Sequence, residues 1–219
     1  DDPTLSIPSA AVRRLQLLAL LGVTLRHAAI GLGIGTGLGM IGSFLLAASS
    51  TLRTMFLPIA IFLQTIPLIA IAPVIYAVFG SGIATVAVIC GMVTFFPLLV
   101  NLITGLRAGS RQVEDVVTVF GGGRLALLRH VAIPSALPYF FAGLKIAAPA
   151  TIGGAMLYEY LFTFQGLGAA MLTSKNYSQY AFMWTIVAVS VLVSLVVYGL
   201  VVLLERAVLA RRYPPAAER

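Results

Sequence analysis

Long apolar runs constrain this chain more than any other feature of its sequence. Because 60% of the residues are hydrophobic and only 10% are charged, a water-soluble domain of this length would lack polar surface. No run alternates apolar and polar residues as the strands of a membrane barrel do. Each run approaches the about 20 residues that an α-helix needs to cross a bilayer. The sequence therefore predicts an all-α membrane bundle with five spans, at His27–Ala48, Leu57–Phe79, Ile83–Leu106, Tyr139–Leu161 and Phe182–Leu204.

Lys and Arg residues gather in loops that share one side of the membrane if the five spans alternate. These are the loop after the first span, the segment between the third and fourth spans, and a C-terminal tail at 205–219. Lys and Arg in short loops mark the cytoplasmic side, so we expect a multi-pass protein with its C-terminus in the cytoplasm. Orienting the chain in the membrane explains the formal charge of +7 more simply than a nucleic-acid partner does.

The N-terminal region departs from this rule. The alternation of spans places it outside, yet it carries Arg13 and Arg14. Residues 1–26 mix apolar and basic residues, as a helix lying on the membrane interface does. The chain starts with Asp, and no signal peptide is visible. We expect residues 1–26 to form an external interfacial segment of a single transmembrane domain, and a further spanning helix to precede the chain.

One long polar segment, residues 107–138, interrupts the apolar runs and is called the knob below. Its acidic residues and its run of glycines predict a short amphipathic helix over Ser110–Phe120. Acids suit the positive end of a helix, and glycine suits the left-handed conformation that stops one. A second helix is expected from Arg124 up to Pro134. Because loops in helical bundles run about 2–8 residues, we interpret the knob as a structure that docks on a cytosolic partner. The alternative is an ordinary solvated loop.

The spacing within the knob resembles the cytoplasmic loop in the membrane subunits of bacterial ABC importers. In that family the Glu of a Glu-Ala-Ala triplet lies six residues before a Gly. A Pro that follows a hydrophobic residue lies thirteen residues after that Gly. Here these positions hold Asp115-Val116-Val117, Gly121 and Ile133-Pro134, so the triplet departs from the family pattern. The resemblance implies that contact with an ATPase is made by Glu114, Asp115, Val116, Gly121, Gly122, Arg124, Ile133 and Pro134.

Further stretches extend the resemblance over nearly the whole chain, to the nitrate, sulfonate, taurine and bicarbonate group of these type I, binding-protein-dependent permeases. They include the Gln-Thr-Ile-Pro run at 64–67 and the Gly-Leu-Gly run at 166–168. Residues 95–101 and 143–148 look closest to permeases for pyrimidines or other heterocyclic vitamin precursors. The solute stays open among all of these.

The resemblance also implies an assembly in the bacterial inner membrane. Two permease copies form the path, as a homodimer or a heterodimer, and two ATPase subunits dock inside. An extracytoplasmic binding protein delivers the solute. The chain has no Gly-Lys-Ser/Thr phosphate loop, so ATP and Mg²⁺ are expected on the ATPase. We expect no catalytic residue, metal site or cofactor in this chain.

Polar residues at membrane depth are candidates for a translocation path. Gln64 and Thr65 lie in an apolar run beside Pro67, which removes a backbone hydrogen bond. Unwound backbone at this depth is tolerated where it lines a cavity, although a packing kink explains the proline equally well. Glu159 is an ionisable residue in the fourth span, where it either lines the outer mouth or stabilises the loop that follows. We expect the path to be lined by Gln64, Thr65, Pro67 and Glu159.

Two further segments carry predictions about packing. Gly31, Gly35 and Gly39 are one helical turn apart, a spacing that permits close contact between helices in lipid. Residues 165–180 contain glycines and polar residues and are expected to form an irregular segment that dips back towards the path.

Two other functions compete with an ATP-driven permease. A membrane-embedded enzyme needs clustered acids or histidines, whereas the histidines here are His27 and His130 and the acids are scattered. An ion-coupled transporter needs intramembrane acids to bind its ion, and Glu159 is the one that qualifies.

Overall fold

The computed structural model describes residues 10–212, and nearly all of them are helical. The described part of the chain contains no strand, so the predicted all-α class is confirmed. The elements are α1 (Ala10–Ala48), α2 (Ser50–Leu63), α3 (Leu68–Phe79), α4 (Ile83–Leu106), α5 (Arg111–Val119), α6 (Arg124–Leu127), the π-helical η2 (Leu128–Ala132), α7 (Ile133–Phe162), α8 (Gly166–Asn176) and α9 (Tyr180–Arg212).

Within the described residues, four helices are long and apolar enough to cross a membrane. They are α1, α4, α9 and the continuous helix Arg124–Phe162, which joins α6, η2 and α7. The expected second span, Leu57–Phe79, is instead the pair α2 and α3, bent by 102° at a short break. Counted as one broken span, this pair brings the total to the five predicted.

The first span begins earlier than expected. Helix α1 runs without interruption from Ala10, and its membrane-compatible part is the 35-residue stretch Arg14–Ala48. Residues 10–26 therefore belong to the same continuous helix as the first span, and their place on the outer membrane interface stays a prediction. Residues 1–9 of that predicted segment, and 213–219 of the predicted tail, lie outside the described residues.

Helix α4 is the centre of the bundle, and α1 and α7 pack along it most extensively. The predicted glycine stripe faces α4 in register, because a Cβ added at Gly35 would come within 2.5 Å of Thr94 and one at Gly39 within 3.2 Å of Leu98. Small residues on α7 act in the same way, since a Cβ at Gly143 would lie 3.2 Å from the Leu98 backbone. The prediction of close helix contact at this stripe is confirmed.

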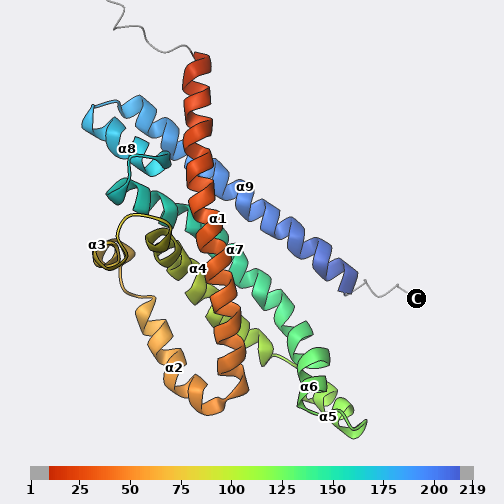
Figure 1. Cartoon of the computed structure of the whole chain (residues 1–219). Coiled ribbons are helices and arrows are strands. Elements are labelled where there is room, and N and C mark those ends of the chain that lie inside the picture. Colours follow the sequence, from red (N-terminus) through yellow and green to blue (C-terminus); the bar gives the residue numbers. More distant parts are fainter. Residues whose placement is uncertain (1–9, 213–219) are drawn as a thin grey trace, which may run out of the picture.

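The two ends of the bundle differ in structure (Figure 1). At one end, α5 and α6 extend beyond the start of α7, at the same end of the bundle as the turn between α1 and α2. At the opposite end, α8 lies beside the amino-terminal half of α1. Residues 165–180 were expected to be irregular, yet Gly166–Asn176 form helix α8, packed on α1, α7 and α9. Contacts with those three helices stabilise a structure that the local sequence does not indicate.

A polar pair joins α7 and α9 towards the end of the bundle that carries the knob. Lys145 Nζ donates to both carboxylate oxygens of Glu205, at 3.0 and 2.9 Å. The pair is mostly buried and bidentate, so it fixes how the two helices lie along each other.

We predict that Gly35→Val destabilises the folded protein by ~1–3 kcal/mol or more, because the added methyl groups would overlap Thr94 on α4. Gly37→Val is the matched control, since a Cβ at Gly37 meets nothing within 4 Å. Thermal unfolding of the detergent-purified protein measures both. Equal melting temperatures for the two variants would refute this packing.

We predict opposite labelling of single cysteines at the two ends of the bundle. Ser110→Cys in the knob should react with a membrane-impermeant maleimide only when the cytoplasmic face is open to the reagent. Ser81→Cys, exposed in the turn between α3 and α4, should react from outside. The native Cys90 is fully buried and gives a low background. Reaction of Ser81→Cys from the cytoplasm alone would invert the topology.

Candidate functional site

The knob is built around a helix stop. Helix α5 spans Arg111–Val119, within one residue of the predicted Ser110–Phe120 at each end. Gly121 follows with φ of +78°, and its N–H donates to the Thr118 carbonyl at 2.9 Å. Gly122 N–H donates to the Val117 carbonyl at 2.8 Å, which completes the paired hydrogen bonds of a glycine-terminated helix. A side chain at Gly122 would also clash with Val117, so both glycines are required by the geometry.

One face of the knob is apolar and exposed. Helix α5 buries none of its residues, and Val113, Val116 and Val119 follow one another at helical spacing along it. Val119 and Phe120 are 84% and 87% exposed. Apolar groups exposed together on a polar protrusion mark a surface that binds a partner. The other predicted docking residues on the exposed part of the knob are Glu114 in the first turn of α5, Asp115 after it, and Arg124 at the start of α6.

The knob continues directly into a membrane span. The second knob helix was expected to end at Pro134, but the helix runs on through Ile133 and Pro134 to Phe162. The sequence prediction was wrong because the turn before the proline is π-helical, at Leu128–Ala132. That wider turn rearranges the backbone hydrogen bonds, so the missing proline N–H does not end the helix. The second knob helix is therefore continuous with the span formed by α7.

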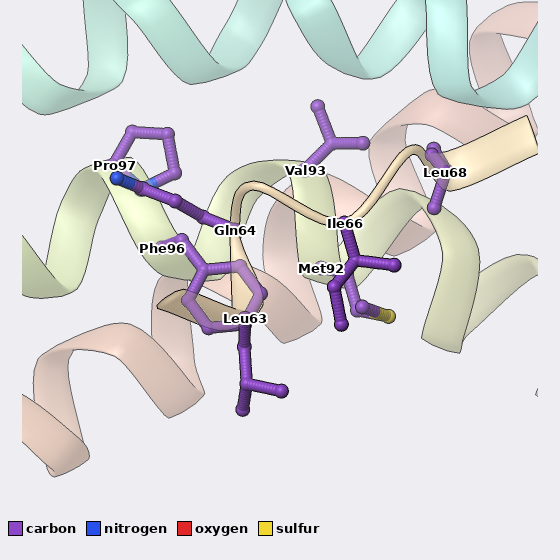
Figure 2. A pocket seen from close by; sticks show the side chains of 8 residues that line it. All are labelled: Leu63, Gln64, Ile66, Leu68, Met92, Val93, Phe96 and Pro97. Carbon is purple, nitrogen blue, oxygen red and sulfur yellow. The ribbon is translucent and has the colours of Figure 1, made fainter. Parts of the chain in front are cut away.

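The break between α2 and α3 places Gln64 beside α4. The last turn of α2 tightens, because Thr65 N–H and Ile66 N–H donate to carbonyls only three residues back. Pro67 then starts α3 without a side-chain cap. Gln64 is exposed and lines a pocket of about 260 Å³ in which its side chain extends towards Pro97 (Figure 2). The other lining residues are Leu63, Ile66, Leu68, Met92, Val93 and Phe96.

Thr65 lies on a different surface from Gln64. Its hydroxyl donates to the Phe62 carbonyl at 2.7 Å, and its side chain lines a shallow groove beside Arg53 and Pro58. The structure therefore does not bring the two predicted path residues together, since adjacent residues at the end of a helix point in different directions. The pocket beside Gln64 combines the amide of that side chain with an apolar wall. None of the residues that line it is charged.

Glu159 is enclosed within the subunit. Its side chain is 0% exposed and lies where α1, α7 and α8 meet. Oε2 accepts hydrogen bonds from the Thr24 hydroxyl at 2.8 Å and the Gly168 N–H at 3.0 Å, and Oε1 lies 2.8 Å from Nδ1 of His27. Gln64 lies in an exposed pocket and Glu159 in the interior of the subunit, so these two predicted path residues occupy separate sites.

Sequence reasoning missed Thr24 and His27 as partners of this carboxylate. Both are polar, three residues apart in an apolar helix, so they share one helix face. That spacing is the signal that identifies a polar face within a span. Their contact with Glu159 joins positions more than 130 residues apart, which no local pattern reports.

The curated relatives of this chain include permeases. It is 34% identical to a probable ABC transporter permease protein from Haemophilus influenzae, over 80% of this chain and 72% of that protein. It is 35% identical to the formylaminopyrimidine transport permease protein ThiX from Halalkalibacterium halodurans, over 68% of this chain and 59% of that protein. A riboflavin transport system permease protein, RibX from Chloroflexus aurantiacus, is 32% identical over 65% and 53%. The matched stretch thus spans between about half and three quarters of these relatives' length.

The fold matches a solved transporter. An inward-facing structure of the MetNI methionine ABC transporter superposes with a TM-score of 0.75, covering 90% of this chain and 98% of that one. The identity is 17%, so this likeness establishes the fold. Residues 19–210 match the family described as the binding-protein-dependent transport system inner membrane component. The chain therefore belongs to that family of multi-pass inner-membrane permease proteins.

Proposed function

We propose that this chain, with a second copy of itself, forms the translocation path of an ATP-driven importer and couples to a separate ATPase through the knob. The observation that carries the proposal is the exposed apolar face of α5, followed by an unbroken helix into the membrane. An apolar face exposed to water in this way marks a surface that a partner covers. In this proposal a binding protein delivers the solute on the outside, and ATPase subunits bind ATP and Mg²⁺ on the inside.

The mechanism follows from how the knob is attached. The helix Arg124–Phe162 contains 39 residues and is about 58 Å long, enough to cross the bilayer. A displacement of the knob by a closing ATPase therefore moves α7 as a unit, and α4 with it, because α4 and α7 are closely packed. The broken span α2–α3 rests on α4, so the pocket at Gln64 changes its exposure when α4 moves. The chain supplies two conformations with different affinities for the solute, and it carries out no bond chemistry.

We propose an uncharged heterocyclic compound as the solute class. The pocket beside Gln64 has an apolar wall containing Met92 and Phe96, and no charged group to hold an anion. Pro97 has no N–H to donate to the carbonyl of Val93, and both residues line the pocket. An amide, a carbonyl and an apolar wall suit a flat compound with a few hydrogen-bonding groups. The names of the two relatives that carry a formylaminopyrimidine and riboflavin support the same class.

An ion-coupled mechanism has less support. It needs an intramembrane acid that is open to the coupling ion. Glu159 is fully buried, and both of its carboxylate oxygens already have partners within the subunit.

We predict that Gly121→Val reduces ATPase copurification and solute uptake by about tenfold, while the chain still inserts into the membrane. Valine at φ of +78° is strained by about 1–2 kcal/mol or more, so the end of α5 must change shape. Gly123→Val is the control, because Gly123 has φ of −81° and ψ of −174°, which valine adopts readily. Normal copurification with Gly121→Val would remove the knob from the coupling interface.

We predict that Gln64→Leu slows uptake of a formylaminopyrimidine about 2–10-fold, as expected when one hydrogen bond to the solute is lost. Uptake is measured in proteoliposomes with the ATPase and binding protein present. The matched control is Thr65→Val, because the Thr65 hydroxyl donates to the Phe62 carbonyl and does not line this pocket. Because no charged residue lines the pocket, excess nitrate should not compete with this uptake in the unmodified protein or in either variant. If Gln64→Leu transports like the unmodified protein, the pocket is not on the path.

A further inference from the structure

The amino end of α8 is capped by two other helices. Its own N-cap residue, Gln165, makes no side-chain capping bond. Instead, the Leu167 N–H donates to the Thr24 hydroxyl of α1 at 2.9 Å, and the Gly168 N–H donates to Glu159 of α7 at 3.0 Å. The first N–H groups of a helix need such partners, and they are usually supplied by the residue just before the helix. Helix α8 thus depends on α1 and α7 for its start.

The Glu159 carboxylate completes this arrangement. Thr24 accepts from Leu167 and donates to Glu159, so a continuous chain of hydrogen bonds crosses from α8 through α1 to α7. Nδ1 of His27, with Glu159 ionised, donates to the second carboxylate oxygen at 2.8 Å. The negative charge also lies at the positive end of the α8 dipole. These donors together offset the cost of burying a charge at 0% exposure.

The local sequence is shaped to let the carboxylate approach. Gly166 has φ of +89°, and a Cβ at this position would overlap the carboxyl group of Glu159. A Cβ at Gly168 would overlap the Met156 carbonyl and the side chain of Glu159. Glycine at both positions is therefore what allows α8 to lie directly on the carboxylate.

Glu159 also occupies a particular place along α7. The helix that contains it starts in the knob at Arg124 and ends at Phe162, so Glu159 lies at the end farthest from the knob. We propose that Glu159 is a positioning residue for transport: it holds α8 to α7 and α1, so that α8 moves with α7 when the knob is displaced. This inference rests on the proposed function, because it assigns α8 a part in the ATP-driven movement.

The position of α8 can be measured directly at Ser174. This residue is 2% exposed, and its hydroxyl donates to the Ala170 carbonyl within α8. In the Ser174→Cys chain, an impermeant maleimide added from outside should react slowly. Adding Glu159→Ala should raise the labelling rate about tenfold, because the Gly168 N–H and Thr24 lose their shared partner.

The functional measurement uses the complete complex with its ATPase and binding protein in proteoliposomes. Glu159→Ala should lower uptake of a formylaminopyrimidine about tenfold, while ATP hydrolysis stays within about twofold of the unmodified complex. A residue needed only for folding would lower both together. Glu159→Gln keeps an acceptor oxygen for the Gly168 N–H and should restore much of the uptake.

A second pair of variants tests the same contact without removing the charge. Thr24→Val deletes the acceptor for the Leu167 N–H, so it should raise Ser174→Cys labelling and lower uptake. Thr173→Val is its matched control, because that hydroxyl donates within α8 to the Ala169 carbonyl. If Glu159→Ala does not fold, Thr24→Val measured against Thr173→Val carries the test.

The outcomes separate the inference from the proposed function. Unchanged labelling of Ser174→Cys in Glu159→Ala or Thr24→Val, or increased labelling with normal uptake, would overturn the role of Glu159. Equal loss of uptake and ATP hydrolysis would reduce it to a folding role and also overturn the inference. Failure of the unmodified complex to couple ATP hydrolysis to uptake would overturn the proposed function instead, whatever the labelling shows.

Discussion

Close backbone contact along α4 is the constraint on which the rest of the structure depends. Lipid offers no hydrophobic drive for helices to associate, so their packing must come from short distances and well-fitted surfaces. Gly35 and Gly39 provide this on the α1 side, and Gly143 and Gly154 provide it on the α7 side. With α4 held between two helices, the broken span α2–α3 has a fixed surface to rest on, and the pocket at Gln64 has a defined wall.

Helix α7 joins the parts of the molecule to which we assign a function. It begins in a knob with an exposed apolar face, passes along α4, and ends beside α8. The buried Glu159 secures that last contact, and losing one partner of such a buried charged group costs a protein ~3–5 kcal/mol. In the mechanism we propose, movement at the knob reaches the opposite end through the continuous helix and the buried hydrogen bonds. In the proposed mechanism, this continuity lets the chain respond to ATP hydrolysed on another subunit.

Features set by neighbouring residues could be predicted from the sequence. The spans follow from apolar length, and the stop of α5 follows from Gly121, whose left-handed conformation the prediction requires. Features set by distant contacts could not. Helix α8 was expected to be irregular. Its capping partners, Thr24 and Glu159, come from other helices, so the sequence around α8 does not show them. The continuation of α7 through Pro134 depends on a π-helical turn, and no residue pattern in the sequence marks it.

The central claim is that the knob docks on an ATPase and passes its movement to α7. Site-specific photo-cross-linking from Phe120 tests this most directly, because that side chain is 87% exposed at the end of α5. A photoreactive phenylalanine analogue placed there in native membranes should form one major adduct, and mass spectrometry should identify it as an ATP-hydrolysing subunit. Adducts only with lipid, or only with a second copy of this chain, would contradict the account.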